Sequence, residues 1–485
     1  MKQGSQSPTF LQNIMIIDYL KELFLQNFGH NPTAEQQNAI AQLSAFILGI
    51  SADGGMKTER PSGLRHEVFV MRGFAGTGKT SLVAALVKTM VGLERECILL
   101  APTGRAAKVF ATYANHPAFT IHKQIYRQKS MEADAGFSLD FNSHKHTLFI
   151  VDEASMIAEG ATDSPYGSEH LLDDLIQYVY SSEGCRLIVL GDTAQLPPVG
   201  EEWSPALQPE VWRSYGLSVT CITLTQVVRQ ERLSGILSNA TALRGMIEGE
   251  SNDFHVEWTA DVVNTSGNEL IETLADSYRR YGTDDTIVVC RSNKRAHIYN
   301  MGIRNQILDR EEELSRGDII MIAKNNYHWL GDDSFLANGD IARVVRVRNE
   351  RELYGFRFAD CTLILPDYDD REIIATVLLD TLHTEAPALG RAEQEQLYNR
   401  VLEDYADIPY KRDRLKKLRE DPYYNALQIK YAYAVTCHKA QGGQWADVYV
   451  DQGYITPDML TTDYYRWLYT AFTRATQQLH LVNWK

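Results

Sequence analysis

The stretch GFAGTGKTSL, residues 73–82, decides how the rest of the chain is interpreted. It follows an apolar run that ends at Met71 and precedes a helix-prone segment that begins at Ser81. Glycines followed by lysine and threonine, between a strand and a helix, form a loop whose backbone N–H groups and helix dipole hold phosphates. The stretch therefore predicts a nucleoside triphosphate site.

Each residue type of this loop suits one part of that site. We expect Gly76, Thr77 and Gly78 to bring the backbone close to the phosphates of ATP. Lys79 is expected to reach the β and γ phosphates, and the Thr80 hydroxyl is expected to ligate Mg²⁺.

A second apolar run, TLFIVDEAS (147–155), ends in Asp152 and Glu153. Beside a phosphate loop, the first acid is suited to hold Mg²⁺, directly or through water, and the second to orient and deprotonate the attacking water. Taken alone, such a pair is often a solvated strand end. The pairing with the loop predicts hydrolysis rather than small-molecule phosphorylation, which would need a lid over the nucleotide instead of a base.

Short, fully apolar runs recur along the chain and predict buried strands of parallel sheets in an α/β protein. In the first half they are 67–73, 97–104, 147–153 and 186–192, and in the second half 221–228, 286–293, 431–439 and 446–453. We therefore expect two α/β lobes. Only the first has the lysine-bearing loop, so the second lobe is expected to close over the nucleotide.

Two insertions interrupt these lobes. Closely spaced alternating segments between 317 and 380, with the turn NGD at 338–340, predict a small antiparallel barrel. The charged segment 391–425 predicts a solvated helical hairpin. The predicted domains are a first lobe at 1–110 and 148–216 with an inserted hairpin at 111–147, and a second lobe at 217–316 and 426–485 with the barrel and helical segment at 317–425.

Composition bounds the class of protein. The formal net charge of -15 argues against nucleic-acid binding by the protein surface in general. Nucleic-acid binding would therefore require a local basic track on that surface. The six cysteines form no CxxC pair, which predicts buried reduced thiols rather than zinc or a disulfide framework. No apolar run reaches the length of a membrane span. We expect a cytoplasmic protein.

Nine motifs occur in an order that resembles a known family. They are PTAEQQNAI (32–40), GFAGTGKT (73–80), APTGRAAKVF (101–110), FTIHKQIY (119–126), IVDEASM (150–156), GDTAQLPPVG (191–200), LTQVVRQ (224–230), VTCHKAQG (435–442) and LYTAFTRAT (468–476). The set is similar to the helicases of superfamily 1, most closely the RecD-like branch with the Dda-like enzymes. The resemblance implies two RecA-like lobes that bind ATP between them and single-stranded DNA that is threaded 5′ to 3′.

The resemblance also implies roles for residues of the nucleotide site. Gln36 becomes the adenine reader and Gln195 the γ-phosphate sensor. Arg229 and Arg474 become cationic contacts of the γ-phosphate, and arginines in such places contribute about 10³ to 10⁵ in rate. Gly442 is counted with the nucleotide-binding residues.

Polar loops that follow successive strands predict the DNA track, because hydroxyls and backbone N–H groups hold phosphates without reading sequence. The candidates are Thr103, Arg105, Thr120, His122, Arg291, Asn293, Thr436, His438 and Lys439. The alternative for each hydroxyl is a helix cap or a turn. Within the hairpin 127–146, which by resemblance wedges the duplex apart, Phe137 and Phe141 are available to stack on a base or to pin the hairpin to its lobe. The barrel resembles the SH3-like insertion of the same family.

Other functions stay open at this point. Phosphate-tracking loops do not reveal which sugar they meet, so an RNA motor of the same architecture is an alternative. A second alternative is an ATP-switched module that binds nucleic acid without unwinding it, against which Glu153 and Arg474 speak. By resemblance we expect a monomer that acts on single-stranded DNA and duplex junctions in DNA repair, recombination or replication, with a single-strand binding protein as an open partner.

Overall fold

The computed structural model describes residues 8–50, 66–128, 137–160, 170–228, 234–251, 253–331 and 335–484. The chain forms two compact units. Unit 1 comprises residues 1–102, 106–125 and 139–232, and unit 2 comprises residues 103–105, 126–138 and 233–485.

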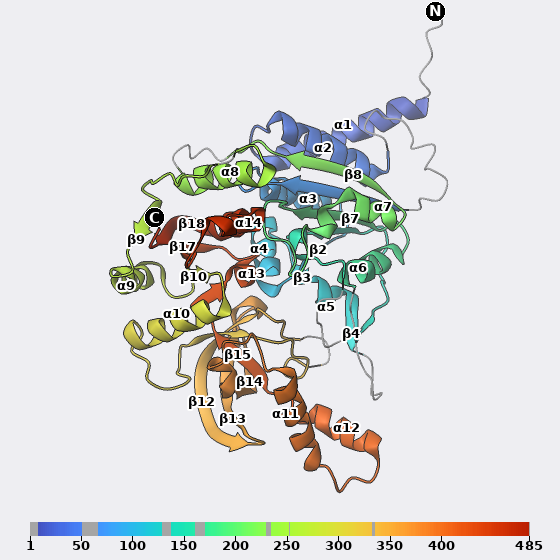
Figure 1. The fold of residues 1–485 in the computed structure, drawn as a ribbon. Helices are drawn as coiled ribbons and strands as arrows, with labels where there is room; N and C mark the ends of the chain where they lie inside the picture. Colours follow the sequence, from blue (N-terminus) through green and yellow to red (C-terminus); the bar gives the residue numbers. More distant parts are fainter. Residues whose placement is uncertain are drawn as a thin grey trace, which may run out of the picture. The chain divides into compact units, whose positions relative to one another are not determined.

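Unit 1 is built on a six-stranded parallel sheet with the order β3-β2-β6-β7-β1-β8 (Figure 1). Its strands are β1 (His66–Gly73), β2 (Cys97–Ala101), β3 (Ala118–Thr120), β6 (Leu148–Val151), β7 (Arg186–Gly191) and β8 (Leu217–Leu224). The central strands are buried along most of their length, as uninterrupted apolar runs require when helices cover both faces of a sheet.

The helices of unit 1 each contribute buried residues to its core. They are α1 (Pro8–Phe28), α2 (Ala34–Leu48), α3 (Lys79–Gly92), α4 (Gly104–Ala114), α5 (Ile121–Ile125), α6 (Leu171–Tyr180) and α7 (Pro209–Ser214). In α3, Leu82 and Leu86 lie one turn apart and pack in one core cluster with Phe69 of β1 and Ile150 of β6. This packing holds the start of α3 at the carboxyl end of β1.

Unit 2 contains a second parallel sheet with the order β16-β10-β17-β18-β9. Its strands are β9 (Val262–Thr265), β10 (Thr286–Cys290), β16 (Ala434–Thr436), β17 (Trp445–Asp451) and β18 (Ala475–Val482). Its helices are α8 (Gly235–Glu248), α9 (Leu270–Tyr281), α10 (Asn293–Gln306), α13 (Cys437–Ala440) and α14 (Thr462–Phe472).

Unit 2 also contains a closed five-stranded barrel (Figure 1). Its strands are β11 (Ile319–Ile322), β12 (Ile341–Leu353), β13 (Phe356–Leu365), β14 (Arg371–Leu378) and β15 (Leu427–Tyr431). Between β14 and β15 the chain forms the helical hairpin α11 (Arg391–Glu403) and α12 (Lys411–Glu420). The strand pair β4 (Tyr126–Gln128) and β5 (Phe137–Leu139) forms the base of the predicted wedge hairpin. The predicted fold class, two parallel-sheet lobes with a small barrel and an inserted hairpin, is confirmed.

The structure moves three of the predicted boundaries. β8, predicted in the second lobe from residue 217, pairs with β1 and belongs to unit 1. β3, predicted within the insertion 111–147, pairs with β2, so the hairpin insertion begins at Tyr126. β15, predicted in the second lobe from residue 426, closes the barrel against β11. All three boundaries differ for the same reason. An apolar run indicates that a strand is buried, but it does not indicate which strand it pairs with.

Two expectations from composition can be compared with the structure. All six cysteines have free thiols, five of them buried and Cys221 half-buried. Among the described residues, no helix combines the length and the apolar character needed to cross a membrane.

Candidate functional site

The loop between β1 and α3 has the backbone conformation that a phosphate-binding loop needs. Gly76 has φ 76° and Gly78 has φ 83°, in the left-handed region that strains any residue with a side chain. A Cβ atom on Gly78 would also lie 2.5 Å from the amide nitrogen of Gln36. Glycine is therefore required at Gly78 on both grounds.

Lys79, the first residue of α3, lies over the same loop. Its Nζ donates a hydrogen bond to the carbonyl oxygen of Phe74 at 3.0 Å and another to that of Gly73. The Thr77 hydroxyl is fully buried and donates to the Phe74 carbonyl at 2.8 Å. The loop thus orders its own ammonium group at the helix N-terminus, where an anion is favoured.

Asp152 and Glu153 follow β6, two strands from β1 in the sheet. The Asp152 carboxylate accepts hydrogen bonds from the Tyr113 hydroxyl and, at 2.8 Å, from the Glu153 N–H. Burial raises the pKa of Asp152, and these hydrogen bonds and the charge of Lys79 partly offset the rise. Glu153 has φ 51°, a strained conformation of the kind that collects at functional sites.

Tyr113 was not among the site residues predicted from the sequence. Its ring stacks on Phe110 of the same helix, with ring centroids 5.1 Å apart, and its hydroxyl reaches the predicted metal ligand. The only signal in the sequence is an aromatic pair with helical i, i+3 spacing after APTGRAA, which does not show that α4 faces the end of β6.

The residues present fit a magnesium ion and a triphosphate. Asp152 offers a carboxylate and Thr80, which is exposed at the start of α3, offers a hydroxyl, and Mg²⁺ binds oxygen ligands of these kinds. Gln195 follows β7 and is 6% exposed, yet among the described residues its Oε1 has no hydrogen-bond partner. A buried amide oxygen without a partner is costly, which is consistent with a water molecule beside the γ-phosphate supplying the missing donor.

Gln36, predicted to read adenine, has its amide committed elsewhere. Its Nε2 donates to the carbonyl oxygen of Thr77 at 3.0 Å, and its Oε1 accepts from the Thr33 N–H at 3.0 Å. The second contact is half of a capping box that begins α2. The side chain is 2% exposed, so the structure places Gln36 as a support of the phosphate loop.

A segment after β8 is also fastened to this loop. Glu35 accepts hydrogen bonds from the N–H groups of Thr225 at 2.7 Å and Gln226 at 2.9 Å. The Val228 N–H then donates to the carbonyl oxygen of Gly76 at 2.8 Å. Arg229, predicted to touch the γ-phosphate, lies outside the described residues.

The predicted nucleotide residues of unit 2 lie at the start of β17 and β18. Arg474 is buried, and its guanidinium donates to the carbonyl oxygens of Thr470 at 3.0 Å and Gly443 at 3.1 Å. Gly442 has φ 73°, so this turn also depends on glycine. The role of Arg474 at a phosphate stays a prediction.

The DNA candidates near the first sheet follow β2 and β3, whose ends are in register at Ala101 and Thr120. The Thr120 hydroxyl accepts from the Lys123 N–H at 3.1 Å and thus caps α5, as the alternative interpretation holds. Burial lowers the pKa of His122 to about 4, so this residue is neutral at pH 7. Thr103 and Arg105 group with unit 2, where the Arg105 guanidinium lies 3.9 Å from the centre of the Trp445 ring.

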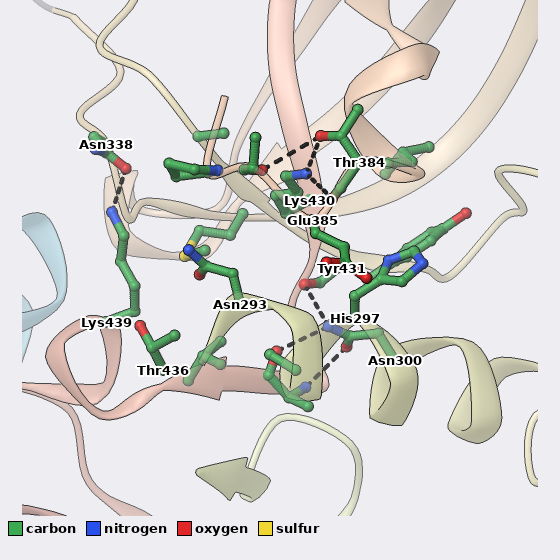
Figure 2. A pocket seen from close by; sticks show the side chains of 18 residues that line it. Asn293, His297, Asn300, Asn338, Thr384, Glu385, Lys430, Tyr431, Thr436 and Lys439 are labelled. Carbon is green, nitrogen blue, oxygen red and sulfur yellow. Dashed lines mark hydrogen bonds between the residues drawn. The ribbon is translucent and has the colours of Figure 1, made fainter. Parts of the chain in front are cut away.

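The candidates on the second sheet gather at the ends of β10 and β16, which are in register at Cys290 and Thr436. Figure 2 shows Asn293, Thr436 and Lys439 around one pocket, with Lys430 and Thr384 on its other side. The Lys439 ammonium donates to the side-chain oxygen of Asn338 (Figure 2), and burial lowers the pKa of Lys439 to about 8.

Two further DNA candidates of unit 2 lie next to this pocket but are not among its lining residues. Arg291 is exposed beside Tyr464, with its guanidinium 5.7 Å from the ring centre, and His438 is exposed next to Lys439.

The wedge candidates are only partly described. Phe141 is 78% exposed, which leaves its ring available for stacking. Phe137 begins β5, but its side chain and the predicted hairpin tip at 132–136 lie outside the described residues.

The fold and these sites define a class of protein. One parallel-sheet unit combines a phosphate loop, a half-buried carboxylate and a neighbouring glutamate. The other unit presents polar groups at the carboxyl ends of its strands. This is the organisation of a two-lobed P-loop ATPase.

Comparison with known proteins narrows the class. A family model described as an AAA domain matches residues 62–261, and a model described as a UvrD-like helicase C-terminal domain matches residues 431–482. An uncharacterised protein of Acanthamoeba polyphaga mimivirus is 22% identical over 502 residues, with 85% of this chain and 95% of the relative covered. The ATP-dependent RecD2 DNA helicase of Deinococcus radiodurans is 30% identical over 192 residues, with 38% of this chain and 22% of the relative covered.

Solved structures of Pif1 helicases align over most of the chain at low similarity. The Bacteroides enzyme in complex with ADP-AlF3 and single-stranded DNA has a TM-score of 0.45 at 16% identity, with 94% of this chain and 93% of that chain covered. The enzyme from Candida albicans has a TM-score of 0.43 at 17% identity, with 94% and 95% covered. Similarity at this level decides nothing about substrate or mechanism.

The AAA-domain model over the first sheet and the UvrD-like helicase C-terminal model over the second place the chain among the helicases. It is an ATP-hydrolysing DNA helicase.

Proposed function

We propose that this helicase moves 5′ to 3′ along single-stranded DNA and separates duplex strands ahead of it. The observation that carries the proposal is the placement of the candidate groups at the carboxyl ends of both sheets. They follow β2 and β3 of the first sheet and β10 and β16 of the second sheet, and each pair of strands is in register at its end. Side chains of this kind bind successive phosphates of a strand and do not contact the bases, so binding does not depend on base sequence.

In unit 1 the chemistry of ATP hydrolysis can be assigned to residues. Glu153 takes the proton of the attacking water, whose oxygen forms a new bond to the γ-phosphorus while the bond to the bridging oxygen of ADP breaks. Lys79 neutralises charge on the phosphates, and the buried Gln195 amide contacts the γ-phosphate. Mg²⁺ held by Thr80 and Asp152 would neutralise further charge on the β and γ oxygens.

Strand displacement tests the proposal. Duplexes with a single 5′ tail or a single 3′ tail are incubated with ATP and either the wild-type chain or the Lys79→Ala variant. We expect unwinding of the 5′-tailed duplex alone, and none by the variant. Preference for the 3′ tail would contradict the polarity, and ATP-dependent binding without displacement would favour the switched binding module.

The remaining alternative is an RNA motor, and it is tested by comparing how strongly DNA and RNA oligonucleotides stimulate ATP hydrolysis. We expect single-stranded DNA to raise the rate well above that obtained with RNA of the same sequence. Equal or greater stimulation by RNA would make RNA the substrate.

We further propose that the chain acts as a monomer in DNA repair, recombination or replication, with a single-strand binding protein as an accessory partner. The support for this pathway is the resemblance to superfamily 1 alone. Sedimentation of the chain alone and with single-stranded DNA tests the monomer, and a dimer that forms on DNA would contradict it.

A further inference from the structure

The helix α12 (Lys411–Glu420) stands out in an acidic chain. Its sequence KRDRLKKLRE contains six basic and two acidic residues, whereas the whole chain has a net charge of -15. Its neighbour α11, RAEQEQLYNRVLE, mixes two basic with three acidic residues, as an ordinary solvated helix does. The charge of the hairpin is therefore concentrated in one of its two helices.

The basic and apolar residues of α12 lie on different sides of the helix. Leu418 is buried and Leu415 half-buried in a core cluster with Phe358 and Leu378 of the barrel, and they define the inner side of the helix. Arg412, Lys416 and Arg419, at i, i+4 and i+7, line one flank, which we call the basic flank, and all three are exposed.

The opposite flank of α12 is neutralised by its own acids. Lys417 forms an ion pair with Glu420 at 3.0 Å, and Asp413 lies one turn before Lys417 on the same flank. Lys417 first, and Lys416 after it, lower the pKa of the fully exposed Glu420. Among the described residues, neither Arg412 nor Lys416 makes an ion pair, although the charges of Lys416 and Glu420 interact. The three cations of the basic flank therefore outnumber the one carboxylate beside them.

The hairpin holds this flank on a fixed support. Besides Leu418, the residues Leu397 and Val401 of α11 are buried in the same cluster against the barrel. The Tyr405 hydroxyl donates to the Asp421 carboxylate at 2.8 Å, and this bond ties the link between the helices to the end of α12. In Figure 1 the two helices lie together beside β13 and β14. Because the helix backbone that carries the basic flank is already ordered, binding a partner costs less conformational entropy than it would for a disordered basic segment.

The charge and spacing fit a nucleic-acid backbone. Arg412 and Arg419 are seven residues apart, or about 10 Å along a helix. The phosphates of one strand of a duplex recur about every 3.4 Å along its axis, so the flank can follow about three of them. Sites for single strands add aromatic rings on which bases stack. The basic flank contains no aromatic residue, which favours a duplex, and the exposed Tyr410 lies before the helix begins.

We propose that the basic flank of α12 binds the phosphodiester backbone of duplex DNA, as a contact separate from the strand-end groups of the two sheets. The proposal rests on DNA being the substrate, but it requires neither unwinding nor ATP. An acidic protein segment and single-stranded DNA are the competing occupants, and the experiment below distinguishes both from a duplex.

The test is equilibrium binding without nucleotide, measured over a range of salt concentrations. The probes are a blunt DNA hairpin without a tail and an unstructured single strand. The main variant is Arg412→Gln/Lys416→Gln/Arg419→Gln. The matched control is Lys417→Gln, and the pair Lys416→Gln and Lys417→Gln compares adjacent residues of the same type on the two flanks.

Each lost phosphate contact lowers the slope of log affinity against log salt by about 0.9 for a duplex. We expect the triple variant to lower the slope for the blunt hairpin by roughly 2 to 3 and Lys416→Gln to lower it by about 1. Lys417→Gln and all affinities for the single strand should stay unchanged. The double variant Arg412→Gln/Lys416→Gln replaces the triple one if thermal melting shows that changing Arg419 destabilises the fold.

Unchanged duplex binding by the triple variant would overturn the proposal and point to an acidic protein partner for α12. An equal loss for both probes would reassign the flank to the single strand. Neither result bears on the motor itself, whose failure would appear as wild-type ATP hydrolysis that does not respond to single-stranded DNA.

Discussion

The side-chain amide of Gln36 donates a hydrogen bond to the main-chain carbonyl of Thr77, 3.0 Å away. This bond links the start of α2 to the phosphate loop across 41 residues of sequence. The same side chain caps its own helix through Thr33. A residue with these two contacts is suited to position the loop, whereas a residue that reads adenine has its amide facing the base.

The two roles of Gln36 make different predictions for the choice of nucleotide. If Gln36 positions the loop, Gln36→Ala lowers kcat/KM for ATP and GTP together, by roughly 10- to 100-fold, because small displacements of catalytic groups are costly. The control is Gln37→Ala, an exposed glutamine on the same helix, which should change neither. A loss confined to ATP would restore the adenine-reading role.

The Tyr113 hydroxyl donates a hydrogen bond to Asp152, the predicted magnesium ligand. Burial raises the pKa of Asp152, and the hydrogen bond from Tyr113 lowers it. Tyr113→Phe therefore raises this pKa further, so the carboxylate is lost at a higher pH as the solution is acidified. We expect the acidic limb of the kcat/KM profile for Mg-ATP to move to higher pH.

Tyr180→Phe is the control for Tyr113, because the Tyr180 hydroxyl donates to the Glu67 carbonyl at 2.7 Å instead of to Asp152. Coincident pH profiles for Tyr113→Phe and the wild-type chain would show that the hydroxyl does not act on the carboxylate.

Glu153→Gln keeps the shape of the predicted base but removes its ability to accept a proton. We expect ATP turnover to fall by roughly 10² to 10⁴, since general-base catalysis contributes this much. Binding of ATP, measured with a fluorescent analogue, should remain. Glu159→Gln, six residues further along the same connection and exposed, should retain full turnover. Retained turnover in Glu153→Gln would move the base to another residue.

The pKa of Lys439 leads to a prediction of how the affinity for DNA depends on pH. Burial lowers its pKa to about 8, although the nearby Asp340 raises it in part. The ammonium is therefore present below pH 8 and is lost as the pH rises through that value, and its attraction for a phosphate is lost with it. We expect affinity for single-stranded DNA to fall between about pH 7 and pH 9.

Lys439→Arg is the matched variant, since guanidinium stays protonated over this range. The fall in affinity should be absent or much smaller with arginine. An identical fall in both proteins would mean that another group titrates and that Lys439 does not contact the DNA.

The sequence predicted the local parts of this molecule because their chemistry lies within short stretches. The phosphate loop needs only the spacing of its glycines, Lys79 and Thr80 after a strand. The acid pair needs only the end of a later apolar run. The barrel and the helical hairpin were visible in the change of hydrophobic period after residue 317. These features depend on neighbours in the chain, and sequence order preserves neighbours.

Tertiary structure alone decided the contacts between distant segments. β8 has the apolar pattern of any buried strand, and only its pairing with β1 assigns it to unit 1. The contacts Gln36 to Thr77 and Tyr113 to Asp152 join residues 41 and 39 positions apart. The basic residues of α12 can be identified in the sequence. Which flank of the helix faces outward depends on the packing of Leu418 against the barrel. Periodicity specifies which side of an element is apolar, whereas the partner that covers that side is selected by the packing of the whole unit.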